Sequence, residues 1–167
     1  MNYTKFLRLI TVSIFSVTLF FGCGGKTEKE PKEELYPTQK TEKPKNQIVL
    51  NSDDKMQFNL KEIKVKSGVE VTLKLNHTGS LPVNVMGHNF VLLKQGVDLV
   101  DFAESAASEV DNQYIPKDSQ DVIAYTKMIG GGESASVTFT TPEKGTYDFL
   151  CSFPAHYAIM QGKFIVE

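Results

Sequence analysis

Side chains that could bind a metal ion lie close together near the C-terminus of this 167-residue chain. Cys151, His156 and Met160 follow one another in the pattern Cys-x4-His-x3-Met, and a further histidine, His88, stands far upstream. One thiolate, two imidazoles and one thioether are the ligands of a blue-copper site, in which Cys and two His bind in a trigonal arrangement and Met binds weakly along the axis. The pattern therefore predicts a site for one copper ion.

The amino-acid composition excludes several other kinds of site. Two cysteines are too few for a scaffold of several disulfides, a four-cysteine zinc site or a cysteine-ligated iron–sulfur cluster. A net charge of −2 gives no basic excess for nucleic acid, and the glycine-rich motifs of nucleotide sites are absent. Multicopper oxidases and copper nitrite reductases need more histidines than the three in this chain. We therefore expect no enzyme activity, no small-molecule substrate and no nucleic-acid partner.

Residues 1–22 have the pattern of a secretory signal peptide. Lys5 and Arg8 precede an apolar run at residues 9–21, which is shorter than the roughly 20 residues that span a membrane. A glycine and then Cys23 follow this run, in an order that resembles the lipobox of bacterial lipoproteins and predicts a lipid on Cys23. Ordinary cleavage, or an uncleaved anchor in which Cys23 has no role, stays open. With the lipid, the chain would be an extracytoplasmic, membrane-anchored lipoprotein in the periplasm or on the cell surface.

Residues 23–46 are expected to form a lipid-anchored, disordered linker. Beyond Cys23 this segment holds six lysines and five glutamates among threonines and prolines, and its only bulky apolar residues are Leu35 and Tyr36. Such a sequence buries too little apolar surface to offset the entropy that ordering costs. Mixed charges and spaced prolines favour an extended, flexible chain that holds a soluble domain away from a membrane.

Residues 47–167 have the pattern of a single β domain. Apolar and polar residues alternate in several short runs that are bounded by Gly, Pro, Asn or Ser. These runs predict strands at residues 62–66, 69–75, 134–140, 146–151 and 162–166. Strands of this length and spacing favour an antiparallel sandwich or barrel. Residues 97–110 are richer in Ala and Glu, and we expect one helix there, outside the sheets.

Motifs around the predicted ligands resemble those of azurins, bacterial members of the cupredoxin family. The sequence LPVNVMGHN at residues 81–89 and the loop at residues 151–162 match azurin motifs, and further matches extend from about Ile48 to the C-terminus. The resemblance implies the cupredoxin fold, an all-β Greek-key sandwich or barrel with one short helical insertion. It also implies a one-electron carrier whose copper cycles between Cu(II) and Cu(I).

The same resemblance implies a role for each residue at the metal. His88, Cys151 and His156 would be the equatorial ligands and Met160 the axial one. The backbone oxygen of Gly87 would make a second, weak axial contact.

Other residues would act around the ligands rather than on the metal. Asn89 and the backbone N–H of Phe153 would stabilise the thiolate sulfur, again by resemblance. His77 matches an azurin histidine that lies near the copper without binding it. A histidine satisfied by hydrogen bonds near a turn is the alternative reading of His77, and a pH-linked influence on the reduction potential stays open.

An apolar surface around the ring edge of His156 would be the place where electrons enter and leave, as in azurins. The residues of this predicted docking surface are Met56, Leu81, Val85, Met86, Pro154, Ala155, Ala158 and Ile159. Exposed apolar area with few charges suits brief contact with redox partners. For Val85 and Ile159, burial in the core stays an alternative. Cytochromes, or copper reductases and oxidases, are the expected partners.

Two copper functions remain open at this point. The first is an electron carrier tethered to a bacterial membrane, and the alternative is copper storage or delivery with the same fold. A delivery site favours exposed, exchangeable, Met-rich ligands, whereas Cys and two His with a tight loop favour the carrier. The chain departs from azurins at Ala155, where they have glycine, and at Gly68, where they have the second cysteine of a disulfide.

Overall fold

The computed structural model describes residues 46–167. The predicted signal peptide at 1–22, the lipid site at Cys23 and all but the last residue of the predicted linker at 23–46 lie outside the described residues. Within the part described, no helix is both long enough and apolar enough to cross a membrane.

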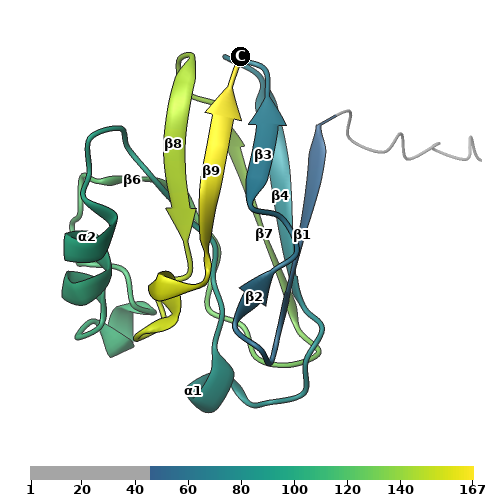
Figure 1. Cartoon of the computed structure of the whole chain (residues 1–167), viewed down its shortest axis with the longest axis vertical. Coiled ribbons are helices and arrows are strands. Elements are labelled where there is room, and N and C mark those ends of the chain that lie inside the picture. Colours follow the sequence, from purple (N-terminus) through teal and green to yellow (C-terminus); the bar gives the residue numbers. More distant parts are fainter. Residues whose placement is uncertain (1–45) are drawn as a thin grey trace, which may run out of the picture. The chain divides into compact units, whose positions relative to one another are not determined.

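Two β-sheets pack face to face (Figure 1). The first sheet has the spatial order β2 (Gln57–Phe58), β1 (Gln47–Asp53), β4 (Glu70–His77) and β7 (Ser134–Thr140). The second has the order β3 (Glu62–Val65), β9 (Gln161–Val166), β8 (Gly145–Leu150), β5 (Val91–Leu93) and β6 (Val122–Tyr125). The β1–β4 and β3–β9 pairs are parallel and the other pairs are antiparallel. The predicted all-β sandwich is confirmed, as two separate sheets rather than a closed barrel.

The main core lies between the sheets and follows from the alternation along the strands. In β4, Val71, Leu73 and Leu75 are buried while the residues between them are partly exposed. Phe149 of the other sheet fills the centre, where it contacts Phe58 of β2 and Phe90, the residue before β5, at centroid distances of 5.8 and 5.6 Å. Tilted ring pairs at such distances add to the free energy gained by burial. Cys151 and Met160 belong to the same cluster, so the predicted site lies at one end of this core.

Helix α2 (Leu99–Ala106) covers the outer face of the second sheet. Its buried residues Phe102, Ala103 and Ala106 pack against Val91, Leu93 and Leu150 in a second apolar cluster. The helix begins at Leu99 because the Asp98 carboxylate accepts hydrogen bonds from the backbone N–H groups of Val100 and Asp101. It ends at Ala106, so it is shorter than the predicted range of 97–110.

Three short turns of helix accompany α2 and were not predicted. They are α1 (Val83–Met86) and the 3-10 turns η1 (Val110–Asn112) and η2 (His156–Ala158). Of these, α1 ends two residues before the predicted ligand His88, and η2 contains the predicted ligand His156. Both therefore position residues of the site.

Candidate metal centre

His88, Cys151 and His156 converge in a buried cluster. The Cys151 sulfur lies 3.9 Å from Nδ1 of His88 and 3.8 Å from Nδ1 of His156, and the three potential ligand atoms all lie within 4.8 Å of one another. The two imidazole rings are tilted by 49° with centroids 5.1 Å apart. These residues come from chain segments more than sixty positions apart, so the convergence is a product of the fold.

The backbone around His88 fixes both its position and the direction of its ring. Its N–H donates to the Ile129 carbonyl and its carbonyl accepts from the Ile129 N–H, each at 2.9 Å. Its Nε2 lies 2.9 Å from the carbonyl oxygen of Asp53 at the end of β1. A carbonyl can only accept, so Nε2 carries the hydrogen and the lone pair of Nδ1 faces the sulfur of Cys151.

The loop from Cys151 to Met160 closes on itself through backbone hydrogen bonds. The Cys151 N–H donates to the Met160 carbonyl at 2.9 Å, and the Met160 N–H donates to the His156 carbonyl at 2.7 Å. Met160 is fully buried in the core cluster that contains Cys151. The loop therefore brings the backbones of all three predicted loop ligands together.

Gly87 lies against the cluster because it has no side chain. A Cβ atom at this position would come within 2.5 Å of the Val83 carbonyl oxygen and 2.9 Å of the Phe153 ring. The Gly87 carbonyl oxygen lies 3.8 Å from the Cys151 sulfur, so it faces the cluster as the predicted weak axial contact requires. An alanine at position 87 would push this oxygen away from the sulfur or displace Phe153.

Asn89 connects the chain segment of His88 to that of Cys151 by hydrogen bonds. Its side-chain amide donates to the Ser152 hydroxyl at 2.8 Å, and its side-chain oxygen accepts from the Ser152 N–H at 2.9 Å. Both residues are buried, so this pair of bonds holds the residue after His88 to the residue after Cys151. Sequence reasoning missed Ser152, although its place next to the ligand cysteine was an available signal.

Burial sets the protonation of the three ligand groups. It raises the pKa of the Cys151 thiol to about 12, an effect that the nearby backbone N–H groups of Asn89 and Phe153 oppose. Burial, and then the proximity of His88, lowers the pKa of His156 to about 4. Burial also lowers the pKa of His88. Without a metal at neutral pH, the site thus holds one protonated thiol and two neutral imidazoles.

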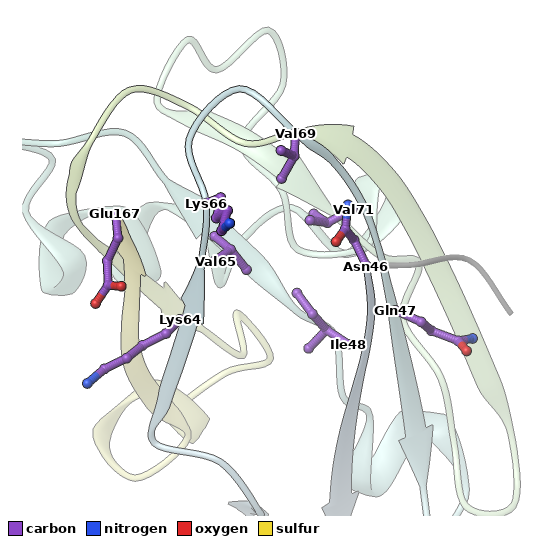
Figure 2. A pocket seen from close by; sticks show the side chains of 9 residues that line it. All are labelled: Asn46, Gln47, Ile48, Lys64, Val65, Lys66, Val69, Val71 and Glu167. Carbon is purple, nitrogen blue, oxygen red and sulfur yellow. The ribbon is translucent and has the colours of Figure 1, made fainter.

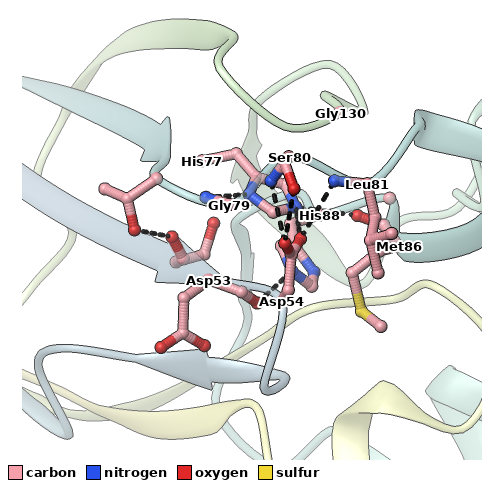
Figure 3. Close-up of polar contacts among 12 residues, drawn as sticks. Asp53, Asp54, His77, Gly79, Ser80, Leu81, Met86, His88 and Gly130 are labelled. Carbon is pink, nitrogen blue, oxygen red and sulfur yellow. Dashed lines mark hydrogen bonds and ion pairs between the residues drawn. The ribbon is translucent and has the colours of Figure 1, made fainter.

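The ring of His77 packs against the ring of His88 (Figure 3). The two rings stack with centroids 4.4 Å apart and planes 28° apart. Nδ1 of His77 accepts from the Gly79 N–H at 3.0 Å, so its Nε2 carries the hydrogen and donates to the Met86 carbonyl at 2.9 Å. His77 is therefore a buried, fully satisfied histidine next to the site, as one of the two readings of the sequence expected.

Asp54 organises the loop that follows His77 (Figure 3). Its carboxylate accepts from the backbone N–H groups of Ser80 and Leu81 at 2.8 and 3.2 Å. The Ser80 N–H is the main reason that the pKa of Asp54 is lowered. The roles of Asp53 and Asp54 could not be predicted, because both depend on where the end of β1 lies in space.

The predicted docking residues lie at or near the surface around this end of the domain. Leu81, Val85, Ala155, Ala158 and Ile159 are exposed, and Val85 and Ile159 have exposed fractions of 53% and 48%, which excludes the core alternative for both. Met56, Met86 and Pro154 are half-buried. His156 itself is 4% exposed, so only a small part of its surface reaches solvent.

Phe153 and Ala155 shape the approach to His156. The Phe153 ring lies between Tyr114 and His156, with centroid distances of 5.2 and 4.6 Å. Ala155 has a φ of 66° and a ψ of −7°, a left-handed conformation that favours glycine. This explains why a glycine suits the position in azurins and makes alanine a strained choice here.

The pocket at the other end of the domain has a different character (Figure 2). It lies between β1 and β3 and includes Ile48, Val65 and Glu167. Glu167 follows the last residue of β9 and Met160 precedes the first, so the pocket and Met160 lie at opposite ends of this strand. Lysines are its only cationic groups, and no His, Cys or Met lines it. The metal-binding chemistry of the described residues is thus confined to the His–Cys–His end.

The donor atoms fit a copper ion. A soft thiolate and two imidazoles suit copper, and a thioether is a known axial ligand of copper. Structural zinc sites instead use four ligands from Cys, His and carboxylates. The described residues place no fourth ligand of that kind with the three, since the cluster contains only His88, Cys151 and His156.

The chain is similar to copper proteins in sequence and in structure. The sequence model of copper binding proteins of the plastocyanin/azurin family matches residues 45–167. Azurin-1 of Alcaligenes xylosoxydans xylosoxydans is 47% identical over 119 residues, which cover 69% of this chain and 92% of that protein. Outer membrane protein H.8 of Neisseria meningitidis serogroup B is 44% identical over 118 residues, covering 68% of this chain and 63% of that protein. The solved azurin Az-iso2 of Methylomonas sp. strain J superimposes with a TM-score of 0.68 at 34% identity, over 74% of this chain and 99% of that one.

Proposed function

Because the chain belongs to the plastocyanin/azurin family of copper-binding proteins, we propose that it carries single electrons on one copper ion bound by His88, Cys151 and His156. The azurin resemblance, the cupredoxin fold and the copper cofactor expected from the sequence are confirmed by the matches above. The observation that carries the proposal is the convergence of one sulfur and two Nδ1 atoms in a buried cluster. Met160 would complete the set of side chains that hold the ion, and the Gly87 carbonyl oxygen would add a weaker contact.

When bound, the copper ion supplies the one-electron chemistry by alternating between Cu(II) and Cu(I). The protein contributes a fixed set of ligands. The Asp53 carbonyl holds the ring of His88, and the backbone bonds of the loop hold Cys151 and Met160. Ligands held in this way need move little between the two oxidation states, which favours rapid transfer. We propose that the N–H groups of Asn89 and Phe153 stabilise the thiolate sulfur and so help set the reduction potential.

We further propose that electrons enter and leave at the apolar surface around His156. Leu81, Val85 and Ile159 expose 37%, 53% and 48% of their surface there. Met56, Met86, Pro154, Ala155 and Ala158 complete this docking surface. Apolar surface of this kind can be desolvated briefly by a second redox protein, such as a cytochrome or a copper reductase or oxidase.

The N-terminal residues extend the proposal to the membrane. We propose that residues 1–22 are a signal peptide, that Cys23 carries a lipid, and that residues 23–46 link this anchor to the copper domain at 47–167. The support is the lipobox-like sequence before Cys23, together with the similarity of the domain to a protein named as an outer membrane protein. The protein would then work outside the cytoplasm, in the periplasm or at the cell surface.

The copper assignment is tested by colour. The chain loaded with Cu(II) should be intensely blue, because of charge transfer from the Cys151 thiolate to the metal. Cys151→Ser should remove the colour, whereas Met160→Leu should keep it and shift the reduction potential. A colourless copper-loaded chain, or a blue Cys151→Ser variant, would contradict the assignment.

Two further measurements test the carrier and anchor proposals. Fast electron self-exchange with slow copper release to a chelator is expected of a carrier, and the reverse result would support the alternative of storage or delivery. The burial of all three donor groups favours slow release. Mass spectrometry of the mature N-terminus should show diacylglycerol on Cys23, and an unmodified N-terminus at another residue would exclude the anchor.

A further inference from the structure

Lys61 holds the loop of proposed copper ligands from outside. It lies just before β3, in a segment that carries none of the ligands. Its ammonium donates a hydrogen bond of 2.6 Å to the Ile159 carbonyl, and its own carbonyl accepts from the Lys163 N–H at 2.9 Å. The side chain and the backbone of Lys61 therefore form hydrogen bonds with the chain on both sides of Met160.

The first of these bonds reaches the ligands through one peptide group. The Ile159 carbonyl, which accepts from Lys61, belongs to the same peptide group as the Met160 N–H. That N–H donates to the His156 carbonyl at 2.7 Å. A charged donor on the carbonyl polarises the peptide group, and the N–H at its other end then becomes a stronger donor. The ammonium of Lys61 is therefore connected to the backbone of His156 by two consecutive hydrogen bonds.

A second feature of the sequence, the glycine at position 162, allows the backbone of Lys61 to lie close to this loop. A Cβ atom at position 162 would come within 2.6 Å of the Lys61 carbonyl oxygen and 2.4 Å of the Phe149 ring, so a glycine is needed there. The glycine lets β9 begin directly against Lys61, one residue after Met160. The lysine backbone is thereby fixed, which leaves only its side chain to be ordered when it bonds Ile159.

We propose that Lys61 is a positioning residue for the loop that carries His156 and Met160, and that its positive charge favours the reduced state of the site. The first part rests only on the hydrogen bonds described, whereas the second rests on the proposed copper function. A nearby positive charge stabilises the state with one positive charge fewer, so Lys61 should raise the reduction potential. Nothing in the azurin-like motifs assigns a role to this residue.

The experiment compares three variants of the full-length protein. Lys61→Met keeps the length of the side chain but removes the donor and the charge, and Lys61→Arg keeps both. Lys64→Met is the matched control, because Lys64 is an exposed lysine of the adjoining strand that pairs with Glu62 and not with the loop. Circular dichroism checks that each variant folds, and Lys61→Gln replaces Lys61→Met if that variant does not.

Two measurements separate the parts of the proposal. In the copper-free chain, hydrogen exchange of the Met160 amide should be about fivefold faster in Lys61→Met and unchanged in Lys61→Arg and Lys64→Met. In the copper-loaded chain, the reduction potential should fall in Lys61→Met, and fall less or not at all in the other two. Unchanged Met160 exchange in folded Lys61→Met, or an equal change in Lys64→Met, would overturn the positioning role. An unchanged potential would overturn the effect of charge, whereas a chain that binds no copper would instead refute the proposed function.

Discussion

Replacing Ala155 by glycine should stabilise the protein, which is the reverse of the usual effect of this substitution. Ala155 has a φ of 66° immediately before the proposed ligand His156. An L-residue with a Cβ atom pays roughly 1–2 kcal/mol for this left-handed conformation. Glycine avoids that cost, but it adds about 0.4–1 kcal/mol of conformational entropy to the unfolded chain. The Ala155 methyl group is exposed, so little apolar burial is lost. The two terms leave a net gain of about 0–1.6 kcal/mol, with about 0.8 kcal/mol at the middle of the range.

Ala158 provides a control of opposite sign in the same loop. It is also an exposed alanine, but it lies in the 3-10 turn η2, outside the left-handed region. Ala158→Gly should therefore destabilise the protein by roughly 0.5–1 kcal/mol. Denaturant unfolding of the copper-free chain measures both changes, and the midpoint for Ala155→Gly should rise with an unchanged slope. If both variants lose stability equally, the argument from backbone strain at Ala155 is wrong.

Two further predictions concern the ligands and the bonds between their segments. Copper uptake at pH 7 should release about one proton, because the thiol of Cys151 has a pKa of about 12 while that of His156 is about 4. Copper affinity should then fall about tenfold per pH unit as the pH drops, and more steeply below pH 4, where His156 also protonates. Calorimetry in buffers of different ionisation enthalpy measures the number of protons released. Release of no proton, or of two, would contradict this prediction. Asn89→Ala should cost about 2–3 kcal/mol of unfolding free energy, because it leaves the buried Ser152 N–H without a partner. A loss below about 0.5 kcal/mol in denaturant unfolding would show that water replaces the amide.

The strands that alternate between core and surface could be predicted from the sequence. The range 134–140 was predicted without error, and the ranges 62–66, 69–75, 146–151 and 162–166 differ from the observed strands by one or two residues at one or both ends. Each of these strands presents one face to the core between the sheets, so period-two alternation marks it.

Strands that do not alternate escaped prediction. In β5, all of Val91, Leu92 and Leu93 are buried, because Leu92 faces the core between the sheets while its neighbours face helix α2. A run buried on both faces shows no period. At the other extreme, β1 ends in Asn51, Ser52 and Asp53, polar residues that are typical of turns. Pairing with β4, which no local pattern records, holds this polar end in the sheet.

The candidate site also contains groups that could be predicted from the sequence and groups that could not. The family resemblance and the spacing predicted the three groups that converge in the cluster, because their chemistry lies in their side chains. The groups that aim those ligands act largely through backbone atoms, as the Asp53 carbonyl does on His88. Any residue could supply that carbonyl, so its identity carries no signal. The position of the Asp53 carbonyl depends on β1, which was itself not predicted.

Burial of the site has opposite consequences for its two kinds of ligand. For His156 it lowers the pKa, so the nitrogen lone pair stays available to a metal at neutral pH without competition from protons. For Cys151 it raises the pKa, so the thiolate exists only when a cation replaces the proton. With the thiol protonated and both imidazoles neutral, the three side chains carry no net charge at neutral pH. Binding of a cation at Cys151 must therefore displace the thiol proton, which is the physical origin of the pH dependence of copper affinity predicted above.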